Sequence, residues 1–335
     1  MFLNSWSLAL TLVSLIVLVL TAVAVRTAVR VLRFWDPGSD DNRQIRLESE
    51  TWLASTLVEY GLGFQIVSLA LFALAADHFC KVISGAMCAT GALNANAFGM
   101  PALLIKLAGV FLYGFWIVLH QLDISSESYP LVRVKYAYLL LLLPLLLCDV
   151  ALQTLYIGHL VPDIITSCCA VVFSAARGEG HNLLATLDQT AVLRAFYASG
   201  FVLAAIGLVL RRRRPAFLLW LYAGGWAWFL CLSLVAIIVA ISSYIYAMPF
   251  HRCPFCILKP EYHYIGFALY ATLLLGSFFG MAGALVGPFR GRPGLAPAVE
   301  RFQKMAVWSS LLLLAIFVAI SSYHYLLYRI LGGES

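Results

Sequence analysis

The sequence predicts an all-α membrane protein, a bundle of about eight transmembrane helices, and three observations support this fold class. Hydrophobic residues make up 62% of the 335-residue chain. Charged residues make up only 11%, whereas a soluble protein carries about 25%. The charged residues also gather between long apolar runs, which is typical of a polytopic membrane protein.

Eight apolar runs are candidates for spans. Each approaches or exceeds the roughly 20 residues that a helix needs to cross the hydrocarbon core, and the longer ones are consistent with tilt. The first is expected to be an uncleaved helix and not a signal peptide, because Arg26, Arg30 and Arg33 follow it. We expect one polytopic domain over 1–335, with a subdivision into 1–176 and 177–335 as the alternative. The runs cover about 6–25, 55–76, 100–120, 136–157, 190–210, 216–247, 263–287 and 306–328.

The basic residues predict the orientation. Most of the 22 Lys and Arg residues follow odd-numbered runs, and the positive-inside rule places such segments in the cytoplasm. Both termini are therefore expected outside the cytoplasm, in a multi-pass protein of the inner (plasma) membrane. The net charge of +6 reflects this orientation and predicts no nucleic-acid partner. The residues expected inside are Arg26, Arg30, Arg33, Arg43, Arg46, Arg133, Lys135, Arg211, Arg212, Arg213, Arg214, Arg290, Arg292, Arg301 and Lys304.

Six of the eight cysteines form three pairs that this orientation places on the extracytoplasmic side: Cys80/Cys88, Cys168/Cys169 and Cys253/Cys256. That side is oxidising, so three structural disulfides are one interpretation. A disulfide between neighbouring residues is strained, however, and strained disulfides are the redox-active ones. The two remaining cysteines, Cys148 and Cys231, fall within helices and are expected to be buried thiols.

Cys253-Pro-Phe-Cys256 has the spacing of dithiol/disulfide catalysts. A helix is expected to begin directly after it, and a helix N-terminus stabilises a thiolate. His251 and Arg252 add positive charge on the amino side. A thiolate there is expected to attack disulfides readily.

Two segments resemble known thiol–quinone oxidoreductases. Cys80-Lys-Val-Ile-Ser-Gly-Ala-Met-Cys88 followed by Phe98-Gly-Met-Pro101 resembles the outward loop of the vitamin K epoxide reductase family, and Cys253-Pro-Phe-Cys256 resembles a helix start in DsbB-type disulfide oxidases. The resemblance implies that Cys80/Cys88 exchange with a soluble thiol partner and that Cys253/Cys256 pass electrons to a quinone. It covers about 40 residues. The family core has four helices, and Cys168/Cys169 lie near where its C-x-x-C would fall.

Further residues are candidates for proton transfer or quinone contact. His263 can accept a proton from the dithiol because histidine titrates near neutrality, although an interfacial role is the alternative. Ser243 and Tyr244 end a hexapeptide, Val239–Tyr244, that recurs as Val318–Tyr323. Tyr264 is a candidate quinone contact or an interfacial anchor, and Asn96 a quinone contact or a turn former. Lys106 lies within a span and is either functional or extends to the membrane surface.

The sequence therefore predicts a membrane thiol–disulfide oxidoreductase that exchanges electrons between an extracytoplasmic thioredoxin-like protein and a membrane quinone. One alternative is a protein that binds or transports a thiophilic metal, because six thiols with His78, His251 and His263 suit soft ions. Another is a structural or assembly subunit of a respiratory or cytochrome-maturation complex. A haem site is disfavoured, because no helix carries two suitably spaced histidines. No phosphate-binding loop or nucleophile elbow is present.

Overall fold

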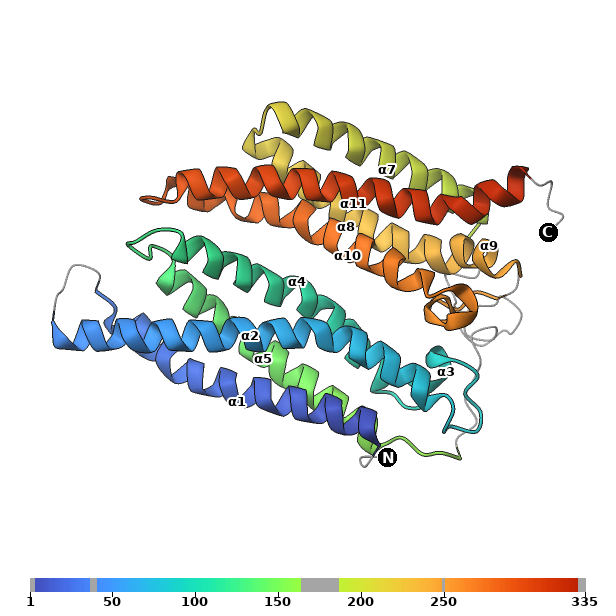
Figure 1. Cartoon of the computed structure of the whole chain (residues 1–335), viewed down its shortest axis with the longest axis horizontal. Coiled ribbons are helices and arrows are strands. Elements are labelled where there is room, and N and C mark those ends of the chain that lie inside the picture. The colour runs from blue at the N-terminus through green and yellow to red at the C-terminus, as the bar shows by residue number, and fades with distance from the viewer. Residues whose placement is uncertain (1–3, 37–40, 164–186, 249–250, 331–335) are drawn as a thin grey trace. The chain divides into compact units, whose positions relative to one another are not determined.

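The structure is a computed structural model that describes residues 4–36, 41–163, 187–248 and 251–330. Within these ranges all secondary structure is helical, and eight helices are long and apolar enough to cross a membrane, which confirms the predicted number of spans. The main helices are α1 (Ser5–Phe34), α2 (Asn42–Phe79), α4 (Gly99–Ile124), α5 (Val132–Gly158), α7 (Gln189–Arg212), α8 (Ala216–Ala236), α10 (Ile265–Leu285) and α11 (Ala296–Ile330) (Figure 1).

Shorter elements complete the spans and their connections. A π turn, η1 (Ile237–Ile241), and α9 (Ser242–Tyr246) continue α8, so that the sixth span covers Ala216–Tyr246. The other short elements are α3 (Ala89–Leu93), η2 (Cys256–Leu258), η3 (Pro260–Tyr262) and η4 (Gly287–Gly291). Side chains cap two of the long helices: Asn4 accepts from the Trp6 N–H before α1, and Asp188 accepts from two N–H groups before α7.

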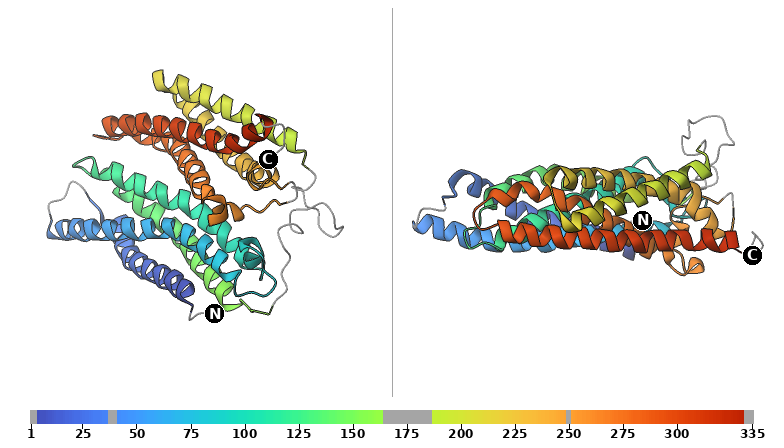
Figure 2. Two further views of the ribbon diagram at one scale, coloured as in Figure 1. Left: turned by 45° about the vertical axis from the view of Figure 1, so that its right-hand side comes forward. Right: turned by 90° about the horizontal axis from the view of Figure 1, so that it is seen from above.

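The chain packs as two compact units. Unit 1 consists of Met1–Ser84, Ala92–Ile164 and Phe289–Val299, and its long helices are α1, α2, α4 and α5. Helices α1 and α4 each pack against both α2 and α5, which makes a closed four-helix bundle (Figure 2). Its core is apolar around Trp116, Leu139 and Leu142.

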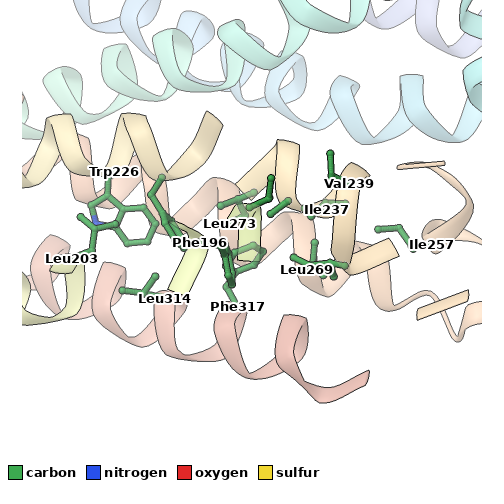
Figure 3. Packing of buried hydrophobic residues seen from close by; sticks show 14 of the residues in the cluster. Phe196, Leu203, Trp226, Ile237, Val239, Ile257, Leu269, Leu273, Leu314 and Phe317 are labelled. Carbon is green, nitrogen blue, oxygen red and sulfur yellow. The ribbon is translucent and has the colours of Figure 1, made fainter. Parts of the chain in front are cut away.

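Unit 2 consists of Gly85–Gly91, Ile165–Pro288 and Glu300–Ser335. Helix α8 packs against α7 and α10, and the Phe317 ring of α11 contacts the rings of Phe196 on α7 and Phe229 on α8. Figure 3 shows this core, which extends from Trp226 to Ile257, the residue that follows Cys256. The thiols of Cys88, Cys253 and Cys256 belong to the same apolar cluster.

The exposed faces of both units carry large apolar side chains such as Trp52, Phe201 and Phe217, which are suited to lipid contact. Cys148 and Cys231 are also exposed, so the prediction that they are buried was wrong. On α5 the reason is periodic: Asp149 is fully buried, and the adjacent position therefore points away from the core.

Candidate thiol site

Three thiols converge in unit 2. The Sγ atoms of Cys88, Cys253 and Cys256 all lie within 4.8 Å of one another, and the three side chains are buried. The Cys253 thiol donates to the Cys88 sulfur at 3.5 Å. Among the described residues, this is the one group of three or more His, Cys, Asp or Glu side chains close enough to share a metal ion. Cysteines separated by more than 160 residues of sequence thus share one site.

Two tyrosines hold the backbone of the Cys-Pro-Phe-Cys segment. The Tyr246 hydroxyl donates to the Cys253 carbonyl, and the Tyr270 hydroxyl donates to the Pro254 carbonyl at 2.7 Å. Tyr246 ends α9 and Tyr270 lies on α10, so the segment is fixed from both flanking spans. The Tyr246 ring also packs at 4.6 Å, centroid to centroid, against the rings of His251 and Tyr262.

The π turn contributes to the position of Tyr246. A π turn adds one residue to a helical turn, and one residue corresponds to about 100° of rotation about the axis. The residues after Ile241 therefore face differently from those of an uninterrupted helix. The repeat Val318–Tyr323 lies within the regular helix α11, whereas Val239–Ile241, the first half of the hexapeptide, belong to the π turn. The hexapeptide alone therefore does not specify the π turn.

Polar groups around the sulfurs are few. Thr90 Oγ1 lies 3.3 Å from Cys253 Sγ, and either atom can be the donor. Hydrogen bonds to Cys253 and Cys88, together with burial, raise the pKa of the Cys256 thiol. Burial lowers the pKa of His251, which Cys88 partly offsets. The imidazole of His251 is thus a base within electrostatic range of the Cys88 thiol.

The prediction that a long helix begins directly after the Cys-Pro-Phe-Cys motif, and stabilises a thiolate there, is wrong. Cys256 begins the three-residue turn η2, and α10 begins only at Ile265. Pro260 and the left-handed residues His263 and Tyr264 (φ 53° and 55°) separate the motif from that helix. The dipole of α10 is therefore not adjacent to the motif and does not stabilise a thiolate there.

The other predicted cysteines are not members of this group of three. Cys80 belongs to unit 1, where it ends α2 and its thiol donates to the Asp77 carbonyl at 2.8 Å. Cys168 and Cys169 lie outside the described residues. No disulfide joins the cysteines that the structure describes.

The predicted proton acceptor and quinone contacts occupy several environments. His263 and Tyr264 are exposed at the turn before α10, and the Tyr264 ring packs against Phe267. The Tyr244 ring packs against Tyr325 and Tyr328 of α11, and Ser243 is buried in α9. None of these four residues belongs to the group formed by Cys88, Cys253 and Cys256.

Asn96 lies in unit 1, where its side-chain amide is engaged by the backbone. Its Nδ2 donates to the Tyr156 carbonyl and its Oδ1 accepts from the Phe98 N–H, both at 3.0 Å. This geometry fixes the turn that leads into α4, and it agrees with the turn-forming interpretation.

The sequence interpretation missed three residues of the site: Thr90, Tyr246 and Tyr270. Thr90 follows Cys88 by two positions, but nothing in the sequence indicates that it faces a distant cysteine. Tyr246 and Tyr270 resemble ordinary interfacial or core tyrosines. Their separations from Cys253 and Pro254, 7 and 16 residues, carry no recognisable motif.

No protein-family model matches the chain, and no curated protein or solved structure matches it. The likeness to thiol–quinone oxidoreductases therefore rests on the local cysteine motifs.

Proposed function

We propose that the protein is a membrane thiol–disulfide oxidoreductase that exchanges electrons between an extracytoplasmic thioredoxin-like dithiol and a membrane quinone. The contact between Cys88 and Cys253 carries this proposal. A thiolate attacks a disulfide sulfur only when it can approach it directly, and Cys88 Sγ lies 3.5 Å from Cys253 Sγ. The approach brings one member of the first pair to the second pair, as an exchange between the pairs requires.

A quinone would supply an acceptor of two electrons and two protons. Its fit rests on the apolar surroundings: the thiols lie in a hydrophobic cluster, directly beyond the sixth span, and a quinone is itself an apolar molecule. Oxidation of Cys253 and Cys256 breaks two S–H bonds and forms one S–S bond, and two electrons and two protons leave. We assign one of these protons to the imidazole of His251, which lies within electrostatic range of the Cys88 thiol.

Exchange between the pairs then conserves electrons. The Cys88 thiolate attacks Cys253, a Cys88–Cys253 bond forms, the Cys253–Cys256 bond breaks, and Cys256 leaves as a thiolate that takes a proton. The resemblance assigns the next attack to Cys80, which forms a Cys80–Cys88 disulfide and returns Cys253 as a thiol. That disulfide oxidises the partner's dithiol. Each step is reversible, so the same residues serve flow in either direction.

A trapping experiment tests this proposal. In a Cys80→Ser/Cys256→Ser variant, neither resolving thiol remains, and mild oxidation is expected to accumulate a Cys88–Cys253 disulfide that peptide mass spectrometry identifies. Cys148 and Cys231 serve as internal controls, because both are exposed and neither belongs to the cluster. Oxidation that links Cys88 or Cys253 to these residues as often as to each other would count against the exchange.

Binding of a thiophilic metal is the second candidate, and the three-sulfur geometry favours it specifically. Three thiolates within 4.8 Å of one another can bind a soft ion such as Cu(I) in trigonal geometry. Metal binding would release protons from the thiols. Stoichiometric Cu(I) binding that is lost in Cys88→Ser, by a protein that shows no quinone-dependent dithiol oxidation, would favour this candidate.

We also propose the sidedness predicted by the basic residues, with both termini and the thiol site outside the cytoplasm. A cysteine introduced at the exposed residue Met87 is expected to react with a membrane-impermeant maleimide from outside the cell. A cysteine at Arg213, after α7, is expected to react only once the membrane is opened. Each is compared with the parent chain, and the reverse labelling pattern would contradict the orientation.

A further inference from the structure

The buried lysine, histidine and aspartate side chains of the described residues all lie in unit 1. They are Lys106, His120, Asp123, Lys135 and Asp149. In unit 2 the buried polar side chains described are Ser, Thr and Gln, together with tyrosines and the cysteines of the thiol site. An ionisable group within a membrane helix is costly and indicates a functional role by default. Five of them in one four-helix bundle therefore require an explanation that the thiol chemistry of unit 2 does not supply.

The first group of these residues surrounds Asp149. Lys106 Nζ lies 3.0 Å from Asp149 Oδ1 and donates to Ser68 Oγ at 3.2 Å. The Gln65 amide donates to the second oxygen of Asp149. The side chains of Lys106 and Asp149 are 1% and 0% exposed. The interpretation that Lys106 extends to the membrane surface is therefore wrong.

Buried polar atoms without a hydrogen-bond partner adjoin this pair. They are Oε1 of Gln65, the hydroxyl of Tyr113 and Oε1 of Gln153, each in a side chain that is at least 98% buried. Gln65 contacts Asp149 directly, Tyr113 lies within the electrostatic influence of Asp149, and Gln153 lies one helical turn further along α5. Gln153 Nε2 in turn donates to Ser14 Oγ at 3.1 Å. These atoms offer acceptors and a donor beyond those that the ion pair uses.

The second group lies towards the opposite end of α4. Lys135 Nζ lies 2.8 Å from Asp123 Oδ2 and 3.2 Å from His120 Nδ1. His120 Nε2 lies 3.6 Å from a carboxylate oxygen of Glu59, whose side chain is 25% exposed. The chain of titratable groups thus runs from Asp123 in the core to Glu59 at the surface of the unit.

An apolar layer separates the two groups. Lys106 and His120 are 14 residues apart on α4, which is about 21 Å at 1.5 Å per residue. Within that interval the core side chains include Leu62, Leu139 and Leu142, all buried. The two groups therefore occupy different depths of the bundle.

The composition of the first group favours the proton over other cations as its ligand. Lys106 already occupies the position that a metal cation would take beside the Asp149 carboxylate, and an ammonium, a carboxylate and a phenol all exchange protons. At this depth α1 presents Ser14 and α2 presents Gln65 and Ser68, none of which titrates. Of the groups on α4 and α5, Lys106, Tyr113 and Asp149 do. The group thus holds three sites for protons and no cage of oxygens for a metal.

We propose that unit 1 carries a proton path, in which Lys106 and Asp149 form a proton-exchanging site within the membrane and the Glu59–His120–Lys135–Asp123 chain leads protons to or from the other end. Protons pass between the two groups in a separate step, because the apolar layer lies between them. It does not depend on the thiol chemistry proposed for unit 2.

Proton uptake by proteoliposomes tests the proposal. Purified protein is reconstituted, a K⁺ diffusion potential is imposed with valinomycin, and a trapped pH-sensitive dye reports internal acidification. Wild-type protein is expected to take up protons faster than protein-free vesicles. The Lys106→Met/Asp149→Asn variant, which removes both charges while keeping similar volumes, is expected to lose the protein-dependent uptake. The matched control is Gln303→Leu, which removes a buried polar side chain of unit 2 and is expected to keep it.

Wild-type uptake equal to that of the double variant would overturn the proposal, as would loss in Gln303→Leu alone. If the double variant fails to fold, infrared difference spectra of the wild type in lipid nanodiscs test the proton path instead. A buried carboxyl signal that responds to stepwise acidification supports the path. Buried carboxylates that stay ionised throughout contradict it.

Discussion

Cys253→Ser and Cys256→Ser are each expected to reduce quinone-dependent oxidation of a dithiol to the level of a protein-free control. The reason is stoichiometric: a two-electron step between sulfur and quinone needs both thiols of the pair, and a serine hydroxyl cannot form the S–S bond. Reconstituted protein is mixed with a reduced thioredoxin-like dithiol and a soluble quinone analogue, and quinone reduction is followed by absorbance. This is the largest activity effect we expect.

The matched control is Cys231→Ser. Cys231 is exposed on α8 and lies outside the cluster of three sulfurs, so its loss is expected to leave turnover unchanged. Equal losses in all three variants would indicate a general effect on folding. Full activity of Cys253→Ser would remove the dithiol from the mechanism altogether.

The same variants distinguish redox chemistry from a structural role of the cysteines. Eight helices satisfy their own backbone hydrogen bonds in lipid, so one cross-link in the segment between the sixth and seventh spans contributes little to whether the helices form. In the redox interpretation the serine variants therefore keep wild-type yield and helical content while they lose turnover. A structural cross-link would instead show its loss as lower yield.

The helices were predictable because one physical requirement dominates the sequence. A span needs about 20 apolar residues, and each of the eight runs contains them. Helix ends were less predictable, since polar residues continue a helix beyond the hydrocarbon: α2 begins at Asn42, well before the predicted run at about 55. The prediction for the segment after Cys256 was also wrong at a helix end. The helix was expected directly after the motif, but Pro260 and the left-handed residues His263 and Tyr264 delay its start to Ile265.

The candidate site was predictable in its cysteines but not in its supporting residues. A relay between the cysteine pairs predicts that the sulfurs of all three pairs converge; the structure brings Cys88 to Cys253 and Cys256, and Cys80 is not in that group. Redox chemistry places no comparable requirement on Thr90, Tyr246 and Tyr270, because hydrogen bonds from many other positions could fix the Cys-Pro-Phe-Cys backbone equally well. The π turn shows a limit of local sequence, since three of its residues, Val239–Ile241, form an α-helix when the same triplet recurs as Val318–Ile320 in α11.

Lys106→Met is expected to cause the largest loss of stability of any variant considered. The substitution leaves the Asp149 carboxylate buried without its counter-ion, and breaking a buried pair in this way costs about 3–5 kcal/mol. Adding Asp149→Asn is expected to recover most of this loss, because removing both charges of a buried pair is often close to neutral. Unfolding is measured in mixed micelles with a rising fraction of denaturing detergent.

The matched control is Lys81→Met, which removes a lysine exposed at the end of α2 and is expected to change stability by no more than about 0.5 kcal/mol. A single variant as stable as the wild type would show that Lys106 does not compensate the Asp149 charge. The double variant also separates packing from chemistry within unit 1. If the pair only joined α4 to α5, a double variant that regained stability would also regain proton uptake. Because we expect the double variant to be stable and yet to take up no protons, stability and proton uptake should diverge in this one protein.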